Sequence, residues 1–203
     1  MKATLLLTLL PLSLGLLGVD VSSLTEVFSC LNSEGYKYAI VRGYMSTGYV
    51  DPNAKANIAN AKAAGMQAVD VYMFPCVPCG DAASQATALW DSLGGSFGTV
   101  WIDVEVYSWN EDQATNQAFI STLVSTLKGH GAIVGIYTSL YNWSSITGGW
   151  TGMASLPLWY AHYDDDASFS DFTGYGGWAR PAMKQYDGNL VVCGAGVDLN
   201  YYP

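Results

Sequence analysis

Charged side chains are scarce in this sequence. Only 12% of its 203 residues are Asp, Glu, Lys or Arg, about half the usual share of roughly 25%. Eight Lys and Arg stand against 17 Asp and Glu, which gives a net charge of -9, and the basic residues form no cluster. Because nucleic-acid binding depends on basic patches that neutralise phosphates, that class of function is excluded.

Histidines and long apolar runs are also few. His130 and His162 have no zinc-ligand spacing with the cysteines, so we expect no metal and no other cofactor. The one long apolar run is N-terminal, MKATLLLTLLPLSLGLLG, and its apolar part of about fifteen residues is typical of a secretory signal peptide and short for a membrane span. We expect cleavage after Gly15, or alternatively after Gly18, and no membrane association of the mature chain. Residues 18–203 are then long enough for one domain with a sizeable core.

Cysteine is present as an even set of four, at positions 30, 76, 79 and 193. In a secreted chain this number predicts two disulfides. Proximity favours Cys76 with Cys79, which leaves Cys30 with Cys193, although four cysteines allow three pairings. A Cys-x-x-Cys between a strand and a helix is also the setting of a thioredoxin-like redox site, which stands as an alternative.

Short aliphatic runs alternate with segments of helical periodicity. The predicted strands are 17–21, 38–42, 67–73, 99–106, 132–137, 158–162, 183–186 and 197–199. The predicted helices between the first six are 24–33, 52–64, 81–92, 111–128 and 140–146. Strand then helix, five times over, predicts an α/β fold with a parallel sheet. Eight strands favour closure of that sheet into a barrel.

Polar side chains gather toward the carboxyl ends of these strands, where (β/α) barrels carry their active sites. In VWIDVEVYSW, the residues Val100, Ile102, Val104 and Val106 alternate with aromatic and acidic residues. Asp103 and Glu105 therefore share one strand face, which we expect to point into the barrel. A half-solvated strand alternates in the same way, but parallel strands are normally covered on both faces.

Two similar motifs begin and end the domain, GVDV at 18–21 and GVDL at 196–199. The first and last strands of a closed barrel are neighbours, so we expect Asp20 and Asp198 to lie side by side. Carboxylates crowded in an aromatic pocket differ in proton affinity, and one is held protonated. Glycoside hydrolysis requires such an acid together with a second carboxylate.

The ordered motifs GVDVS, WIDVEVY, WYAHY, KQY and GVDLN resemble glycoside hydrolase family 25, the Chalaropsis-type lysozymes, over residues 18–203. The resemblance implies an irregular TIM-like barrel, (β/α)5(β)3. It also implies cleavage of the β-1,4 bond between N-acetylmuramic acid and N-acetylglucosamine in bacterial peptidoglycan, for defence or digestion. By motif, Glu105 matches the general acid and Asp103 the carboxylate that orients the 2-acetamido group as it attacks the anomeric carbon. Asp20 and Asp198 match two further acids.

The resemblance also implies which aromatic residues line the substrate groove: Tyr72, Tyr137, Trp159 and Tyr186. Arg42, at the end of the second predicted strand, is a further candidate for the groove, and we expect it to pair with Asp20 or Asp70. The chain departs from the family pattern at two places, with Tyr72-Met73-Phe74 for Tyr-His-Phe and Lys184-Gln185-Tyr186 for Trp-Gln-Tyr. Its acidity would repel anionic cell walls. We therefore expect that the protein is secreted or works in an acidic digestive or phagosomal compartment, where its carboxylates are protonated. We also expect a monomer. A catalytically silent carbohydrate-binding barrel is the alternative function.

Overall fold

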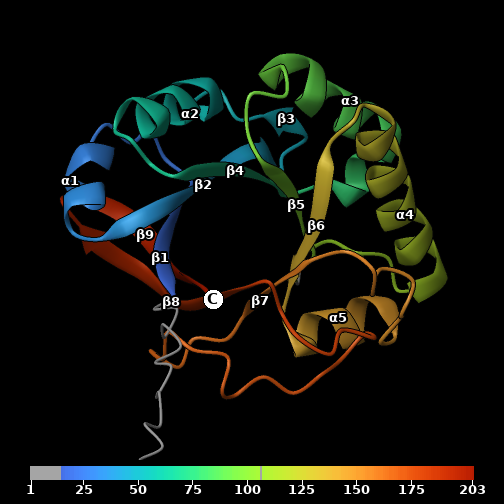
Figure 1. The fold of residues 1–203 in the computed structure, drawn as a ribbon. Helices are drawn as coiled ribbons and strands as arrows, with labels where there is room; N and C mark the ends of the chain where they lie inside the picture. Colours follow the sequence, from blue (N-terminus) through green and yellow to red (C-terminus); the bar gives the residue numbers. More distant parts are fainter. Residues whose placement is uncertain (1–14, 106) are drawn as a thin grey trace, which may run out of the picture.

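A closed ring of eight strands forms the centre of the computed structural model, which describes residues 15–105 and 107–203 (Figure 1). Its strands are β1 (Leu16–Val21), β2 (Tyr36–Met45), β4 (Ala68–Met73), β5 (Thr99–Asp103), β6 (Ile133–Thr138), β7 (Leu158–Ala161), β8 (Met183–Val192) and β9 (Ala195–Tyr202). β1 pairs with both β2 and β9, and these pairings close the ring. The two-residue β3 (Tyr49–Val50) pairs only with β2.

Five helices connect the first six barrel strands. They are α1 (Phe28–Ser33), α2 (Ala54–Ala63), α3 (Ala82–Leu93), α4 (Gln113–Gly129) and α5 (Leu140–Thr147). Neighbouring strands from β1 to β8 run parallel around the ring, and β9 is antiparallel to both of its neighbours. Figure 1 shows these helices on the outside of the barrel, and no further helix follows β7 in the described chain. This arrangement confirms the expected (β/α)5(β)3 barrel.

Helix ends follow local capping chemistry. The Asp112 side chain accepts hydrogen bonds from the backbone N–H groups of Ala114 and Thr115, so α4 begins after Asp112 rather than at Glu111. The Ser139 hydroxyl likewise accepts from the backbone of Asn142 at the start of α5. Gly148 ends α5 in the left-handed conformation, with φ of 70°, where glycine is favoured because it has no Cβ.

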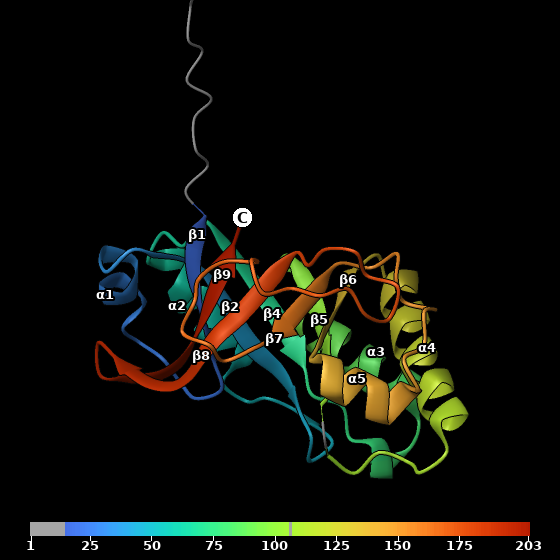
Figure 2. The same cartoon turned by 90° about the horizontal axis from the view of Figure 1, so that it is seen from below.

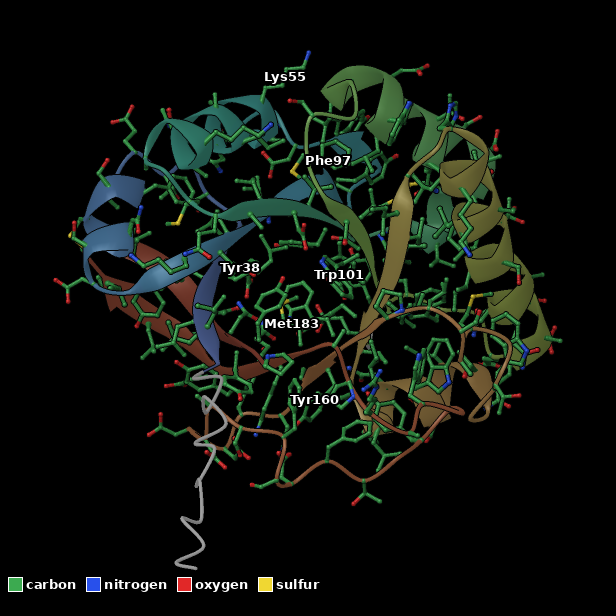
Figure 3. The ribbon with its side chains drawn as sticks, viewed as in Figure 1. Tyr38, Lys55, Phe97, Trp101, Tyr160 and Met183 are labelled. Atoms are coloured by element: carbon green, nitrogen blue, oxygen red, sulfur yellow. A yellow bond between two sulfur atoms is a disulfide. The ribbon has the colours of Figure 1, made fainter. Side chains whose placement is uncertain are left out.

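Each barrel strand presents two different faces. Val100, Ile102 and Val104 are fully buried in the outer core, which lies between the strands and the helices. The inner face carries a separate cluster of Ile40, Trp101, Tyr137, Trp159 and Met183, and Figure 3 shows Trp101 and Met183 inside the ring. The predicted inward and outward alternation along this stretch is therefore confirmed up to Val104, whereas Val106 lies outside the described residues.

The C-terminal strands are longer than the sequence pattern indicates. β8 and β9 form an antiparallel hairpin that extends beyond the barrel beside α1 (Figures 1 and 2). The pattern missed this extension because residues 187–196 lack strict alternation and their register shifts at Asp187. Conversely, β5 ends at Asp103, so Glu105 lies just beyond the strand.

Both expected disulfides are present, Cys30–Cys193 and Cys76–Cys79. The first joins α1 to the turn of the β8–β9 hairpin. The second lies in the loop after β4, where Gln85 accepts a hydrogen bond from the backbone of Cys76 and donates to the carbonyls of Cys76 and Gly80. Because the domain is a closed barrel, the thioredoxin-like alternative is wrong.

The predicted signal peptide lies outside the described residues except for Gly15, which directly precedes β1. Among the helices of the described chain, none is long and apolar enough to cross a membrane.

The two disulfides make unequal contributions to stability. Cys30–Cys193 spans 163 residues and Cys76–Cys79 only three, and a longer closed loop removes more entropy from the unfolded chain. We expect Cys30→Ser/Cys193→Ser to lower the free energy of unfolding by about 5 kcal/mol and Cys76→Ser/Cys79→Ser by about 2 kcal/mol. Urea unfolding of both double variants measures this difference, and the reverse order would contradict it.

Candidate active site

A cavity of about 220 Å³ opens at the carboxyl ends of the barrel strands. All four acids that the sequence predicts line it. The full lining is Asp20, Ser22, Arg42, Tyr72, Phe74, Asp103, Glu105, Tyr137, Trp159, Tyr163, Gln185 and Asp198. A second hollow of about 340 Å³ shares Asp20, Ser22, Tyr72 and Asp198 with it and continues over the β8–β9 hairpin. Together the two form an open groove rather than a closed chamber.

Asp20 and Asp198 lie opposite each other, as the repeated motif predicts. They are register partners across the antiparallel pair of β1 and β9. Asp20 Oδ2 accepts hydrogen bonds of 2.8 Å from the side-chain amides of Gln185 and Asn200. Asp198 accepts from the Gln185 amide at 3.2 Å and from the backbone N–H of Asn189 at 2.6 Å. The Gln185 amide therefore bridges the two carboxylates.

The orientation of this amide is fixed from its other end. Gln185 Oε1 accepts hydrogen bonds from the hydroxyl of Tyr137 at 2.5 Å and from that of Tyr163 at 2.8 Å. With its oxygen engaged by two phenols, the amide presents its N–H groups to the acids. Gln185 thus acts as the hub of the polar network in the cavity.

Burial raises the pKa values of all four acids, and repulsion within the group adds to the shifts of Asp20, Asp103 and Glu105. Burial, followed by the charge of Asp198, raises the pKa of Asp20 to about 7. Burial, followed by the charges of Glu105 and Asp20, raises the pKa of Asp103 well above its ordinary value. The pKa of Glu105 rises through burial and the nearby Asp198, and that of Asp198 rises mainly through burial. The site therefore holds protons near neutral pH, as an acid catalyst requires.

Asp103 has one oxygen free for a ligand. Its side chain is only 4% exposed, and among the described residues nothing hydrogen-bonds to its buried Oδ1. An unsatisfied buried acceptor is costly, on the order of 1 to 3 kcal/mol or more for a charged group. Bound substrate could remove that cost by donating an N–H or O–H to this oxygen.

Aromatic rings form the floor and rim of the cavity. Tyr137 and Trp159 pack with ring centroids 4.4 Å apart, and the indole N–H of Trp159 donates to Asn200. At the rim, Phe74 meets the half-exposed Tyr107 edge to face at 5.5 Å. Rings at the mouth of a groove offer apolar faces on which sugar rings can stack.

Two expected groove residues are placed differently. Tyr186 lies in the outer core and does not line the cavity, because Gln185 points inward and successive side chains of a strand point to opposite faces. Arg42 does line the cavity, but its guanidinium pairs with Asp51 at 2.6 Å rather than with Asp20 or Asp70. Asp70 instead accepts from the Trp101 indole and the backbone N–H of Thr99.

The sequence interpretation also missed several site residues. Asn200 and Tyr163 contribute directly to the polar network, and Phe74 lines the cavity. A signal for Asn200 was present, since it stands two residues from Asp198 on the same face of one strand. Tyr163 ends the WYAHY motif, but strand alternation does not predict where its side chain points, because it follows β7 in an irregular segment.

Among the described residues, one group of side chains has metal-ligand chemistry. It consists of His162, Asp164 and Asp171, whose ligand atoms lie within 4.8 Å of one another. The group lies outside the cavity lining. The ammonium of Lys184 already bonds both of its carboxylates, at 2.7 and 2.9 Å. The ammonium of Lys184 therefore already balances the charge of these carboxylates. His162 also pairs with Asp171 at 2.6 Å.

A closed (β/α)5(β)3 barrel with carboxylates of raised pKa in an aromatic groove at the carboxyl ends of its strands defines a class, the barrel glycoside hydrolases. Comparison with known proteins agrees. The family described as Lysozyme-like protein 1 matches residues 15–186. The bacterial lysozyme from Streptomyces coelicolor has a crystal structure similar to this fold, with a TM-score of 0.79 and 26% identity over 94% of this chain and 93% of that chain.

Two curated relatives narrow the assignment. Probable GH family 25 lysozyme 2 of Dictyostelium discoideum is 49% identical over 191 residues, which cover 92% of this chain and 90% of the relative. Lysozyme-like protein 5 of Caenorhabditis elegans is 40% identical over 195 residues, with 92% and 91% coverage. The chain therefore belongs to the glycoside hydrolase family 25 lysozymes.

The crowded acids make stability depend on pH. A carboxyl whose pKa is raised on folding stabilises the protein while it is protonated, and that contribution is lost as pH rises through the folded-state pKa. For Asp20 the window runs from 3.8 to about 7. We expect the free energy of unfolding to fall by roughly 2 to 3 kcal/mol between pH 5 and pH 8, at 1.36 kcal/mol per pKa unit.

Urea unfolding at the two pH values, with wild type and Asp103→Asn, measures this effect. Removing the Asp103 charge should flatten the decline and raise stability at pH 8. Asp91→Asn, at an exposed position on α3, is the matched control and should keep the wild-type slope. A wild type that gains stability from pH 5 to pH 8 would contradict the expectation.

Proposed function

We propose that this protein is an N-acetylmuramidase that hydrolyses the β-1,4 bond between N-acetylmuramic acid and N-acetylglucosamine in bacterial peptidoglycan. The observation that carries the proposal is the cluster of four carboxylates, two of them over nine-tenths buried, in a groove open to a polymer. Membership of the family 25 lysozymes supports the same reaction.

In the proposed mechanism, Glu105 is the general acid, because burial and Asp198 keep its proton available above its ordinary range. The free Oδ1 of Asp103 accepts the N–H of the 2-acetamido group and orients that group. The acetamido oxygen attacks the anomeric carbon, the glycosidic bond breaks, and Glu105 donates its proton to the departing oxygen. Glu105 then takes a proton from water, which opens the cyclic intermediate and restores the acid.

Asp20 and Asp198 have an electrostatic role in this proposal. Positive charge develops at the anomeric carbon in the transition state, and whichever of the two carboxyls is ionised stabilises it from the same cavity. The Gln185 bridge keeps both acids aimed at one point. Tyr72 on the floor and Phe74 with Tyr107 at the rim stack on the sugar rings, and the buried Trp159 supports Tyr72 from below.

Clearing of a suspension of bacterial cell walls tests the proposal. Wild type should clear the suspension, and Glu105→Gln should lower the rate by about 10² to 10⁴, the usual worth of a general acid. Glu111→Gln makes the same charge change at an exposed residue before α4 and should clear like wild type. Equal rates for wild type and Glu105→Gln would refute the assignment of Glu105.

The same assay separates the alternative function. If wild type binds cell-wall fragments without clearing them, the catalytically silent carbohydrate-binding barrel is supported instead. Asp103→Asn sharpens the distinction, since a pure binding protein would keep or improve its affinity when a buried charge is removed.

We propose that the enzyme works in an acidic compartment, such as a digestive or phagosomal one, or is secreted into an acidic medium. The proton on Glu105 is lost as pH rises through its raised pKa, so hydrolysis should decline above that point. The net charge of -9 also repels anionic walls less when carboxylates are protonated. A pH profile of clearing measures this, and an optimum well above neutrality would contradict it.

We also propose that a signal peptide ends at Gly15, since β1 begins at Leu16. Cleavage after Gly18 would remove residues that pair with β2 and β9. The mature protein should therefore start at Leu16 when its N-terminus is sequenced.

We further propose that the protein is a monomer, which gel filtration measures.

A further inference from the structure

A buried ammonium group lies directly behind the active site. Lys184 on β8 is 0% exposed and points away from the barrel interior, because its neighbour Gln185 points inward. Its Nζ donates to Asp164 at 2.7 Å and to Asp171 at 2.9 Å. Desolvation opposes its charge, but these two hydrogen bonds outweigh it and raise the pKa of Lys184. The same bonds lower the pKa values of Asp164 and Asp171 despite their own desolvation.

Both carboxylates belong to the irregular segment between β7 and β8. That segment begins at His162, whose backbone N–H donates to the Gln185 carbonyl at 3.0 Å, and Asp165 donates likewise to the Tyr186 carbonyl at 3.1 Å. The segment contains no helix between β7 and β8. The Lys184 ion pairs therefore anchor this segment at Asp164 and Asp171, beside the packing of Phe169 and Phe172 against Tyr160.

The segment also reaches into the catalytic cavity. Tyr163 stands between His162 and Asp164, lines the cavity, and donates its hydroxyl to Gln185 Oε1 at 2.8 Å. Tyr163 is 56% exposed, so packing alone does not fix its ring. Its position depends on the backbone that Asp164 and Asp171 anchor.

We propose that Lys184 is a positioning residue for hydrolysis: its ion pairs with Asp164 and Asp171 hold Tyr163 where its hydroxyl orients the Gln185 amide between Asp20 and Asp198. This inference rests on the proposed function, which supplies the reaction. Lys184 touches no substrate and acts through Tyr163 and Gln185. The position is one where the sequence departs from the family pattern, with Lys in place of Trp.

The chemistry of the amide explains why Tyr163 matters. A glutamine side chain can rotate by half a turn and exchange its oxygen and its N–H₂ group. In the rotated state the hydrogen bonds that the amide N–H₂ group donates to Asp20 and Asp198 would be lost, and the N–H₂ group would face the two phenol hydroxyls. The hydroxyls of Tyr137 and Tyr163 both donate to Oε1 and so stabilise the productive orientation. Loss of the Tyr163 anchor leaves Tyr137 as the one remaining phenol on this oxygen.

A double-mutant cycle tests this chain of contacts. The variants are Lys184→Met, which keeps length without charge, Tyr163→Phe, which removes only the hydroxyl, and the two combined. Initial rates are measured on solubilised, un-cross-linked peptidoglycan strands at a temperature at which every variant is folded by circular dichroism. We expect each single variant to lower kcat about tenfold with KM within twofold, and the double variant to be no slower than the slower single one.

Two results would overturn the proposal. One is a kcat of Lys184→Met within twofold of wild type, and the other is a double variant whose loss is the product of the two single losses. Leu127→Ala, in the outer core at the end of α4, is the control for stability. It should lower the melting temperature as much as Lys184→Met or more, yet leave kcat unchanged.

The same experiment keeps this proposal separate from the proposed function. A wild type that does not cleave the strands refutes both. A wild type that cleaves them, together with an unaffected Lys184→Met, refutes only the role of Lys184.

Discussion

The pairing of β1 with β9 is the contact on which the site depends. It joins the first strand of the barrel to the last, which runs antiparallel to it. The register of this pairing sets Asp20 opposite Asp198. Carboxylates from the two ends of the chain then share one cavity with Asp103 and Glu105 from its middle. Without that closure, the acids of β1 and β9 would face water with ordinary pKa values.

Closure brings together charges that repel one another, and the surrounding structure has to compensate. The aromatic inner cluster beneath the cavity fixes the floor, and the side-chain amides of Gln185 and Asn200 donate to Asp20. The outer core of aliphatic residues holds the strands against the helices. Cys30–Cys193 ties the hairpin that contains β9 to α1. Holding these acids together costs stability, as is common where a fold holds groups for catalysis, and the rest of the structure offsets that cost.

Strand alternation predicted much of this site from the sequence. It placed Asp103 inward and Val100, Ile102 and Val104 outward, because successive side chains of a strand must face opposite ways. The same rule was available for β8, where Gln185 and Tyr186 cannot both face the cavity. The family resemblance led us to expect Tyr186 in the cavity. In the structure Gln185 faces the cavity, and Tyr186 faces the outer core.

Contacts made by irregular segments were not accessible from the pattern. Arg42 pairs with Asp51, which follows a two-residue strand without a sequence signal. Tyr163 and the ion pairs of Lys184 depend on a segment that has no periodicity. In such segments the backbone path is set by side-chain partners distant in sequence, so local propensity says little about where a residue points.

By itself, the sequence determined the order of strands and helices and the positions of the carboxylates at the strand ends. Proximity along the chain also favoured the correct pairing of the cysteines. Periodicity and turn chemistry are local, and they are encoded residue by residue. Only the tertiary structure decided which amide bridges the acids, which phenols orient that amide, and how far burial raises the pKa values. These properties depend on distances between groups from separate strands, and such distances exist only once the barrel is closed.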